Sequence, residues 1–286
     1  MSVPPPSPAA RPPRLVGHFV ASQALAWLLA APILGAAVAR LAVWAQNFRA
    51  PLVIFPLLVG CGLGLLLVAL MRLGRIGHRA TIWSGVIAAV AVAVAGQHYF
   101  SFLDFKAALM AEKKPQGISL EAFEAVRETR PDAAGDFAGF MHRQAALGRS
   151  VTAAPKPGGA EFTLRGAAAW ASWAIDGLLV LLSTATIIYF ACRTPYCSLC
   201  RSWYRTTRTG PLAAETARRV AEAAALASEE LTGAARYRLS HCASGCGPSR
   251  LELAYGGQGI EAWLAATQRE QVVRVLDGES GSQEGN

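Results

Sequence analysis

The chain has 286 residues, of which 53% are hydrophobic and only 16% are charged, and its formal net charge is +8. This composition argues against an ordinary soluble enzyme and is typical of a protein with several membrane-spanning helices. The positive charge lies mainly in short arginine-containing segments beside apolar runs, not in a basic domain. We therefore predict no nucleic-acid partner.

The N-terminal residues, 1–14, are rich in proline and are predicted to be disordered. An apolar run follows from residue 15 to about residue 43. A secretory signal peptide is the alternative interpretation of this run, because Ala37-Val-Ala39 has the small residues of a cleavage site. The run is longer than a typical signal peptide, so we favour a membrane helix and leave cleavage open.

Three further apolar runs, at residues 51–71, 80–98 and 167–191, are also long enough to cross a bilayer as helices. Small residues permit close packing of helices in a membrane, and they also offer faces for a homo-oligomer. We expect such packing at Gly60, Gly62, Gly64, Gly85 and Gly96. A nucleotide-binding loop is the alternative for the first three glycines, but it needs a soluble strand-to-helix turn.

Arginines without acidic neighbours flank the apolar runs at three places, and four alternating helices put all three places on one side of the membrane. We therefore expect a cell-membrane protein with a cytosolic N-terminus, a cytosolic C-terminal region and an extracytoplasmic loop at residues 99–165. The arginines concerned are Arg11, Arg14, Arg72, Arg75, Arg79, Arg193, Arg201, Arg205 and Arg208.

The extracytoplasmic loop is predicted to contain short helices. Residues 101–112 continue the third apolar run, and residues 119–129 have apolar side chains at helical spacing. Asp136 is placed to cap a further helix that ends before Gly148.

The C-terminal region is expected to be a small α+β domain. A helix is predicted from Pro211 to about Leu231, and the alternating segments 236–242 and 251–255 are predicted to form a hairpin. Thr267 begins a last helix, because Thr267-x-x-Glu270 has the pattern of a capping box.

Four cysteines in this domain form two close pairs, Cys197-x-x-Cys200 and Cys242-x-x-x-Cys246. A structural zinc ion needs four soft ligands in a tetrahedron, and a pair on a tight turn supplies two of them. The pattern resembles four-cysteine zinc-ribbon-like modules in general, which are mostly structural or interaction devices. His241 is an alternative ligand for one of the four positions.

Other interpretations of these cysteines stay open. A disulfide is disfavoured, because the predicted cytosolic side is reducing. A redox-active Cys197-x-x-Cys200 would begin a helix in a thioredoxin-like unit, and no such pattern surrounds it. Cysteines that bind nothing are a further alternative. We favour zinc, and because four thiolates close its coordination shell, the zinc would be structural.

The expected fold class is therefore an α-helical multi-pass membrane protein, with four transmembrane helices and a small α+β zinc-ribbon-like cytosolic domain. The expected parts are a disordered N-terminus (1–14), a three-helix transmembrane region (15–98), the extracytoplasmic helical loop domain (99–165), a fourth transmembrane helix (166–191), the four-cysteine domain (192–278) and a disordered tail (279–286).

A second group of polar residues is predicted near the outer ends of the helices. Arg40 and Asp176 each lie about one turn from a tryptophan that marks the membrane interface. Because their helices run in opposite directions, we expect these two residues to form an ion pair, or to share contacts with Gln97 or His98. An ion relay or a polar-ligand site is the functional alternative to a pair that fixes helix register.

No zinc-protease, phosphate-loop or nucleophile motif occurs in the sequence. We therefore expect a non-enzymatic membrane protein, whose zinc-stabilised tail binds an unknown cytosolic protein or relays the state of the helix bundle. The alternative is a small transporter or membrane enzyme that uses Arg40, Asp176 and His98.

The predicted orientation is tested by labelling single cysteines, introduced as Gly117→Cys and Ser282→Cys, with a membrane-impermeant thiol reagent in intact cells. The cysteine at 117 should react at once and the one at 282 only after permeabilisation, because an odd number of spans separates them. The unchanged chain controls for labelling of the native cysteines. Labelling of both positions from the same side would contradict the four-helix topology.

Overall fold

The computed structural model describes residues 17, 19–45, 54–110, 136–152, 161–226 and 233–283. The chain divides into two compact units, Val20–Arg193 and Thr194–Asn286, the second together with Met1–Phe19. The predicted disorder of residues 1–14 and the predicted helix at 119–129 lie outside the described residues.

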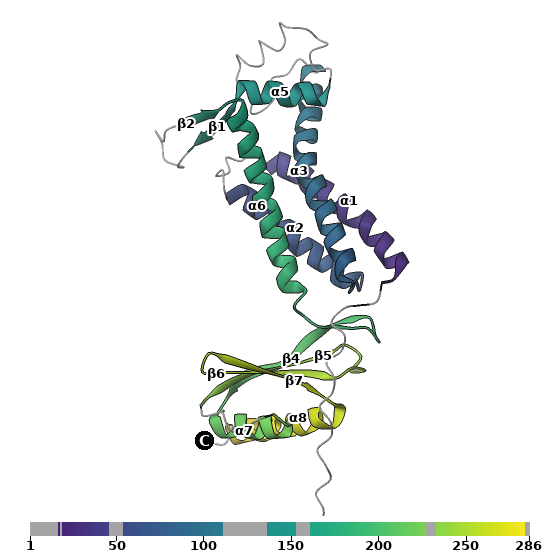
Figure 1. The fold of residues 1–286 in the computed structure, drawn as a ribbon, viewed down its shortest axis with the longest axis vertical. Helices are drawn as coiled ribbons and strands as arrows, with labels where there is room; N and C mark the ends of the chain where they lie inside the picture. The colour runs from purple at the N-terminus through teal and green to yellow at the C-terminus, as the bar shows by residue number, and fades with distance from the viewer. Residues whose placement is uncertain are drawn as a thin grey trace, which may run out of the picture. The chain divides into compact units, whose positions relative to one another are not determined.

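The first unit contains four helices that are long and apolar enough to cross a membrane (Figure 1). They are α1 (Ala21–Ala45), α2 (Ile54–Leu73), α3 (Arg79–Met110) and α6 (Ala167–Ala191). The expectation of four long apolar helices is confirmed. The predicted continuation of the third helix beyond its apolar run is also confirmed, since α3 extends to Met110.

Small residues let α2 lie directly against the backbone of α6. A Cβ atom added at Gly60 would lie 1.9 Å from Ser183 Oγ and 2.6 Å from the carbonyl oxygen of Val180. Thr184 Oγ1 donates a hydrogen bond of 2.9 Å to the Gly60 carbonyl oxygen across the same interface. A Cβ atom at Gly62 would meet no atom within 4 Å. The packing predicted for these glycines is therefore right for Gly60 and wrong for Gly62.

Trp27 joins α1 to α3 in a similar way. Its side chain is fully buried, and a Cβ atom added at Gly85 would lie 2.0 Å from Trp27 Nε1. Trp27 Nε1 donates a hydrogen bond of 3.4 Å to the carbonyl oxygen of Ile82. The missing side chain at Gly85 thus makes room for the indole, and Ile82 supplies the partner that a buried indole N–H needs.

A small segment between α3 and α6 completes the first unit, with α5 (Phe137–Leu147), β1 (Arg149–Thr152) and β2 (Glu161–Leu164). The helix predicted after Asp136 is confirmed, because Asp136 Oδ1 accepts a hydrogen bond of 2.6 Å from the Gly139 N–H. α5 packs on the C-terminal part of α3 through a buried cluster of Phe102, Phe105, Phe140 and Met141. The antiparallel pairing of β1 with β2 was not predicted.

The second unit is a five-stranded antiparallel sheet in the order β3-β4-β5-β6-β7, with two helices. The strands are β3 (Tyr196–Cys197), β4 (Ser202–Leu212), β5 (Ala235–Cys242), β6 (Ser249–Tyr255) and β7 (Gln258–Leu264), and the helices are α7 (Ala214–Ala223) and α8 (Ala266–Gln283). The predicted hairpin is confirmed as β5 and β6.

Both helices of this unit lie on the same side of the sheet (Figure 1). Alternate strand residues such as Leu239, Leu251 and Leu264 are buried against Val220 of α7 and Val272 of α8. Since side chains alternate between the two faces of a strand, the residues between these leucines point to the opposite face. That face is therefore not covered by α7 or α8.

The helix predicted from Pro211 to Leu231 is only partly right, because Pro211 belongs to β4 and the helix α7 begins at Ala214. Pro211 pairs with Arg236 of β5. Proline has no N–H to donate, so it is tolerated where one side of a strand is unpaired. β3 covers only the beginning of β4, so Pro211 lies on such an edge.

Two further boundaries differ from the sequence analysis. β7 was not predicted; its tight connection to β6 uses Gly256 and Gly257, which both have positive φ angles. α8 begins at Ala266, close to the predicted Thr267, and continues to Gln283, past the predicted limit at residue 278.

The interface between α2 and α6 is tested by comparing Gly60→Ala with Gly62→Ala. The methyl group at position 60 has no room beside Ser183 and the α6 backbone, so we expect a loss of about 1–3 kcal/mol, as for other overpacked cores. Thermal unfolding of the detergent-solubilised chain measures the loss. Gly62→Ala should leave the midpoint unchanged, and equal midpoints for both variants would contradict the close contact.

Candidate metal site

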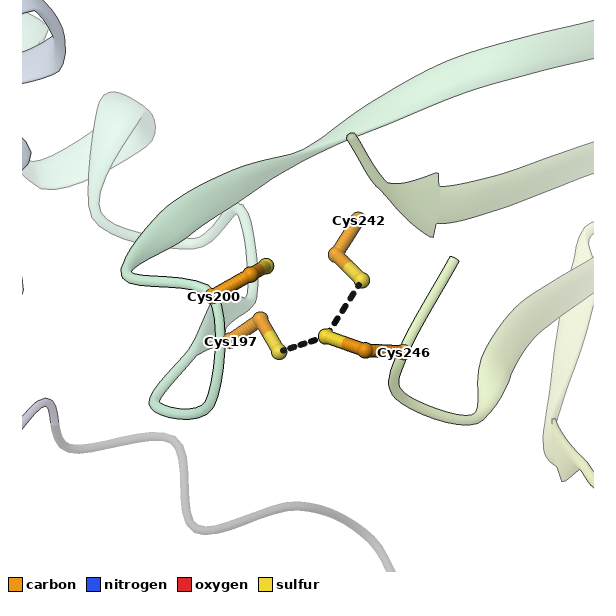
Figure 2. Close-up of side chains that lie close together, drawn as sticks. All are labelled: Cys197, Cys200, Cys242 and Cys246. Carbon is orange, nitrogen blue, oxygen red and sulfur yellow. Dashed lines mark hydrogen bonds between the residues drawn. The ribbon is translucent and has the colours of Figure 1, made fainter. Parts of the chain in front are cut away.

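Two turns of the sheet bring the four cysteines together at one end of it (Figure 2). Cys197 ends β3 and Cys200 lies in the turn that leads to β4, while Cys242 ends β5 and Cys246 lies in the turn that leads to β6. The register of β4 and β5 pairs Tyr204 with Cys242, so the two turns must meet at the same end of these neighbouring strands.

The spacing of the four sulfur atoms fits a single tetrahedral metal ion. All four Sγ atoms lie within 4.8 Å of one another, and Cys246 Sγ lies 3.6 Å from both Cys197 Sγ and Cys242 Sγ. A zinc–sulfur bond of about 2.3 Å implies sulfur–sulfur distances of about 3.8 Å in a tetrahedron. The sequence prediction that these cysteines come together is confirmed, and the set can hold a metal ion.

Tyr204 and Gly247 fix the second turn beside the sulfur atoms. Tyr204 Oη donates a hydrogen bond of 2.7 Å to the carbonyl oxygen of Pro248, and its ring packs against Trp263. A Cβ atom added at Gly247 would lie 2.8 Å from Tyr204 Oη and 3.4 Å from Cys197 Sγ. The turn therefore approaches the cluster closely only because residue 247 has no side chain.

The surroundings of the thiols favour ionisation of one of them. Burial opposes the ionisation of Cys200, but hydrogen bonds from Ser202 and the neighbouring thiols outweigh it and lower the pKa of Cys200 to about 6. Burial raises the pKa of Cys197. Metal binding requires thiolates, and the charge of a bound cation favours the ionisation of the remaining thiols.

Burial, followed by the charges of the nearby cysteines, raises the pKa of Tyr204. The phenol therefore keeps its proton at physiological pH and remains the hydrogen-bond donor that holds Pro248.

Among the described residues, the cluster contains no histidine. His241 neighbours Cys242 on β5, and adjacent strand residues point to opposite faces. Its Nδ1 lies 3.3 Å from Thr207 Oγ1 of β4. The alternative in which His241 replaces a cysteine ligand is therefore wrong.

The two turns differ in their backbone chemistry. Gly245 supplies the left-handed residue of the second turn, with φ of 63°, whereas Arg201 has φ of 51° at the end of the first turn. A left-handed conformation disfavours residues with a Cβ atom by about 1–2 kcal/mol. The structure thus holds an arginine where a glycine would be less strained.

The ion pair predicted between Arg40 and Asp176 is wrong. Arg40 Nη1 donates a hydrogen bond of 2.6 Å to Asp104 Oδ2, and Arg149 Nη1 donates one of 2.5 Å to Asp176 Oδ2. Both actual partners lie outside the apolar runs, Asp104 on the C-terminal part of α3 and Arg149 at the start of β1. The distance from an interfacial tryptophan predicts the depth of a side chain but not the direction in which it points.

The other two residues of this predicted group have separate surroundings. The His98 ring packs edge-on against Trp173 with 5.3 Å between centroids, and it interacts electrostatically with Arg149 and Asp176. The carbonyl oxygen of Gln97 accepts a hydrogen bond from Ser101 Oγ. Of the predicted group, His98 and Asp176 are therefore neighbours, and both lie close to Arg149.

Comparisons with protein-family models, with curated proteins and with solved structures find no match for this chain. The function of this chain must therefore be inferred from its own residues and structure.

The metal site is tested on the full chain purified in detergent, by measuring metal content with mass spectrometry. We expect one metal ion per chain, lost in Cys197→Ser together with a lower unfolding temperature, because removing one ligand opens the tetrahedron. Cys61→Ser is the matched control, since Cys61 lies in α2 outside the cluster. A metal-free chain whose unfolding does not respond to a chelator would disprove the site.

Proposed function

We propose that this chain is a non-enzymatic integral membrane protein, whose zinc-stabilised C-terminal domain faces the cytosol and binds a cytosolic protein. The observation that carries the proposal is the convergence of four thiols from two turns at one end of the sheet. A domain whose two turns are held by one metal ion would have a rigid surface, which is suited to binding another protein.

Zinc is the metal that this ligand set favours. Four thiolates in a tetrahedron are typical of structural zinc and of iron–sulfur sites, and two short turns on hairpins are the arrangement of zinc-ribbon-like modules. With four protein ligands the ion has no open position for a substrate or a catalytic water. The proposed role of the metal is therefore to hold the fold.

The cytosolic orientation is supported by the arginines. Arg72, Arg75 and Arg79 lie at the connection between α2 and α3, and Arg193 follows the end of α6. In a bundle of four alternating spans these two places lie on the same side, and arginine-rich short connections are typical of the cytosolic side. This side is reducing, which keeps the thiols available for a metal.

The face of the sheet opposite α7 and α8 has the chemistry of a polar binding surface. Arg250 Nη2 pairs with Glu252 at 2.8 Å and with Glu261 at 2.7 Å, and Arg238 pairs with Glu252 at 3.7 Å. A partner that binds here would be recognised by charge pairs rather than by an apolar patch.

A small transporter or membrane enzyme is the alternative, and it needs Arg40, Asp176 and His98 at one shared site. Arg40 is paired with Asp104, and Asp176 is paired with Arg149. Since these pairs divide the charged groups between two places, we favour the binding function.

The proposal is tested by crosslinking in cells that express the tagged full chain, followed by quantitative mass spectrometry of the captured proteins. We expect one or a few cytosolic proteins to be enriched with the wild-type chain and with Cys61→Ser, and lost with Cys197→Ser, because the binding surface depends on the metal. Carbonate extraction of each variant checks that it remains in the membrane. Identical captured proteins for all three chains would refute a metal-dependent binding domain.

A further inference from the structure

We infer that the turn between β3 and β4, residues 197–201, binds anionic phospholipid headgroups of the membrane that α6 enters, with Leu199 inserted among them. The inference rests on the proposed membrane insertion, and it goes beyond the proposed binding of a cytosolic protein. Three features of the turn support it: an exposed leucine, a short connection to α6 and a set of arginines.

Leu199 is exceptional in the C-terminal unit. Its side chain is 77% exposed, and it is the one exposed large hydrophobic residue among the described residues from Thr194 onward. Cys197 and Cys200 on either side of it direct their sulfur atoms into the cluster of four cysteines (Figure 2). A bound ion would therefore fix the two ends of the turn and hold Leu199 at its tip.

The chain keeps this tip close to the membrane. Leu199 follows Ala191, the last residue of α6, by eight positions. Eight residues span at most about 27 Å when fully extended, so the tip can reach the headgroup layer. The end of α6 has aromatic and basic residues, which are typical of the headgroup layer. Tyr189 and Phe190 are exposed there, and the Arg193 Cζ atom lies 4.8 Å and 5.5 Å from the centroids of their rings.

The charge around the turn is complementary to anionic lipid. Residues 193–212 contain four arginines and no acidic residue. Arg208 is paired with Asp277 of α8, whereas Arg201, at the end of the turn, and Arg205, within β4, are exposed. Clusters of basic residues next to a membrane span attract anionic headgroups.

Arg201 also occupies a left-handed conformation that a glycine would adopt with less strain, as Gly245 does in the second turn. The arginine at this position brings a guanidinium to the turn although the backbone conformation disfavours a side chain. Arg201→Gly is therefore a clean test, since it removes the guanidinium and suits the backbone of the turn.

The experiment places an environment-sensitive fluorescent amino acid at position 199 of the full chain by stop-codon suppression, and reconstitutes the chain in phosphatidylcholine vesicles with or without phosphatidylserine. Lipids with a nitroxide quencher near the headgroup report contact. The matched control position is Gln258, an exposed residue next to the turn between β6 and β7.

We expect position 199 to be quenched several-fold more than position 258, and more strongly with phosphatidylserine than without it. Arg201→Gly should abolish the gain from phosphatidylserine while the metal content stays unchanged. Equal quenching at positions 199 and 258 in a chain that resists carbonate extraction would overturn the inference and leave the proposed function intact. Shielding of position 199 from aqueous iodide only after cytosolic protein is added would also overturn it. A chain released by carbonate would instead refute the membrane insertion itself.

Discussion

The antiparallel pairing of β4 with β5 is the constraint on which the C-terminal domain depends. Tyr204 lies opposite Cys242 in this pair, so the turns that precede β4 and follow β5 meet at one end of the sheet. A register shift of one residue would turn Cys242 away from the other sulfur atoms, because side chains alternate between the faces of a strand. A metal ion bound there would in turn stabilise this one register, so pairing and metal binding support each other.

The helical unit depends on a different constraint, the absence of side chains at points of close contact. Between helices surrounded by lipid, burying apolar surface would give little driving force, so in a membrane packing and hydrogen bonds would have to hold them together. Gly60 fulfils both conditions, since it lets α2 approach α6 and its carbonyl oxygen accepts the hydrogen bond from Thr184. Gly85 likewise makes room for the side chain of Trp27, whose N–H donates to the carbonyl oxygen of Ile82.

The features that follow from local chemistry could be predicted from the sequence, whereas those that depend on distant partners could not. The apolar runs, the Asp136 cap and the hairpin of β5 and β6 are local. The four cysteines were found because two short spacings on turns are themselves local signs of a metal site. Pro211 was assigned to a helix because its pairing with Arg236 is a contact across the sheet. The partners Asp104 and Arg149 were missed because depth along a helix does not show which way a side chain points.

The two units differ in composition, and the change comes within a few residues of the end of α6. α6 ends at Ala191 and has Asp176 as its one charged residue, whereas from Arg193 to Leu212 every charged residue is an arginine. Such a sequence is unsuited to the interior of a domain, since the charges would repel one another without acidic partners, and within the described part of the chain Arg208 alone of these four arginines forms an ion pair, with Asp277. A surface of phosphate groups would supply the missing negative charge to the others. A metal ion bound by the four cysteines would have a second consequence besides stability, because it would give this short, strongly basic segment a rigid shape.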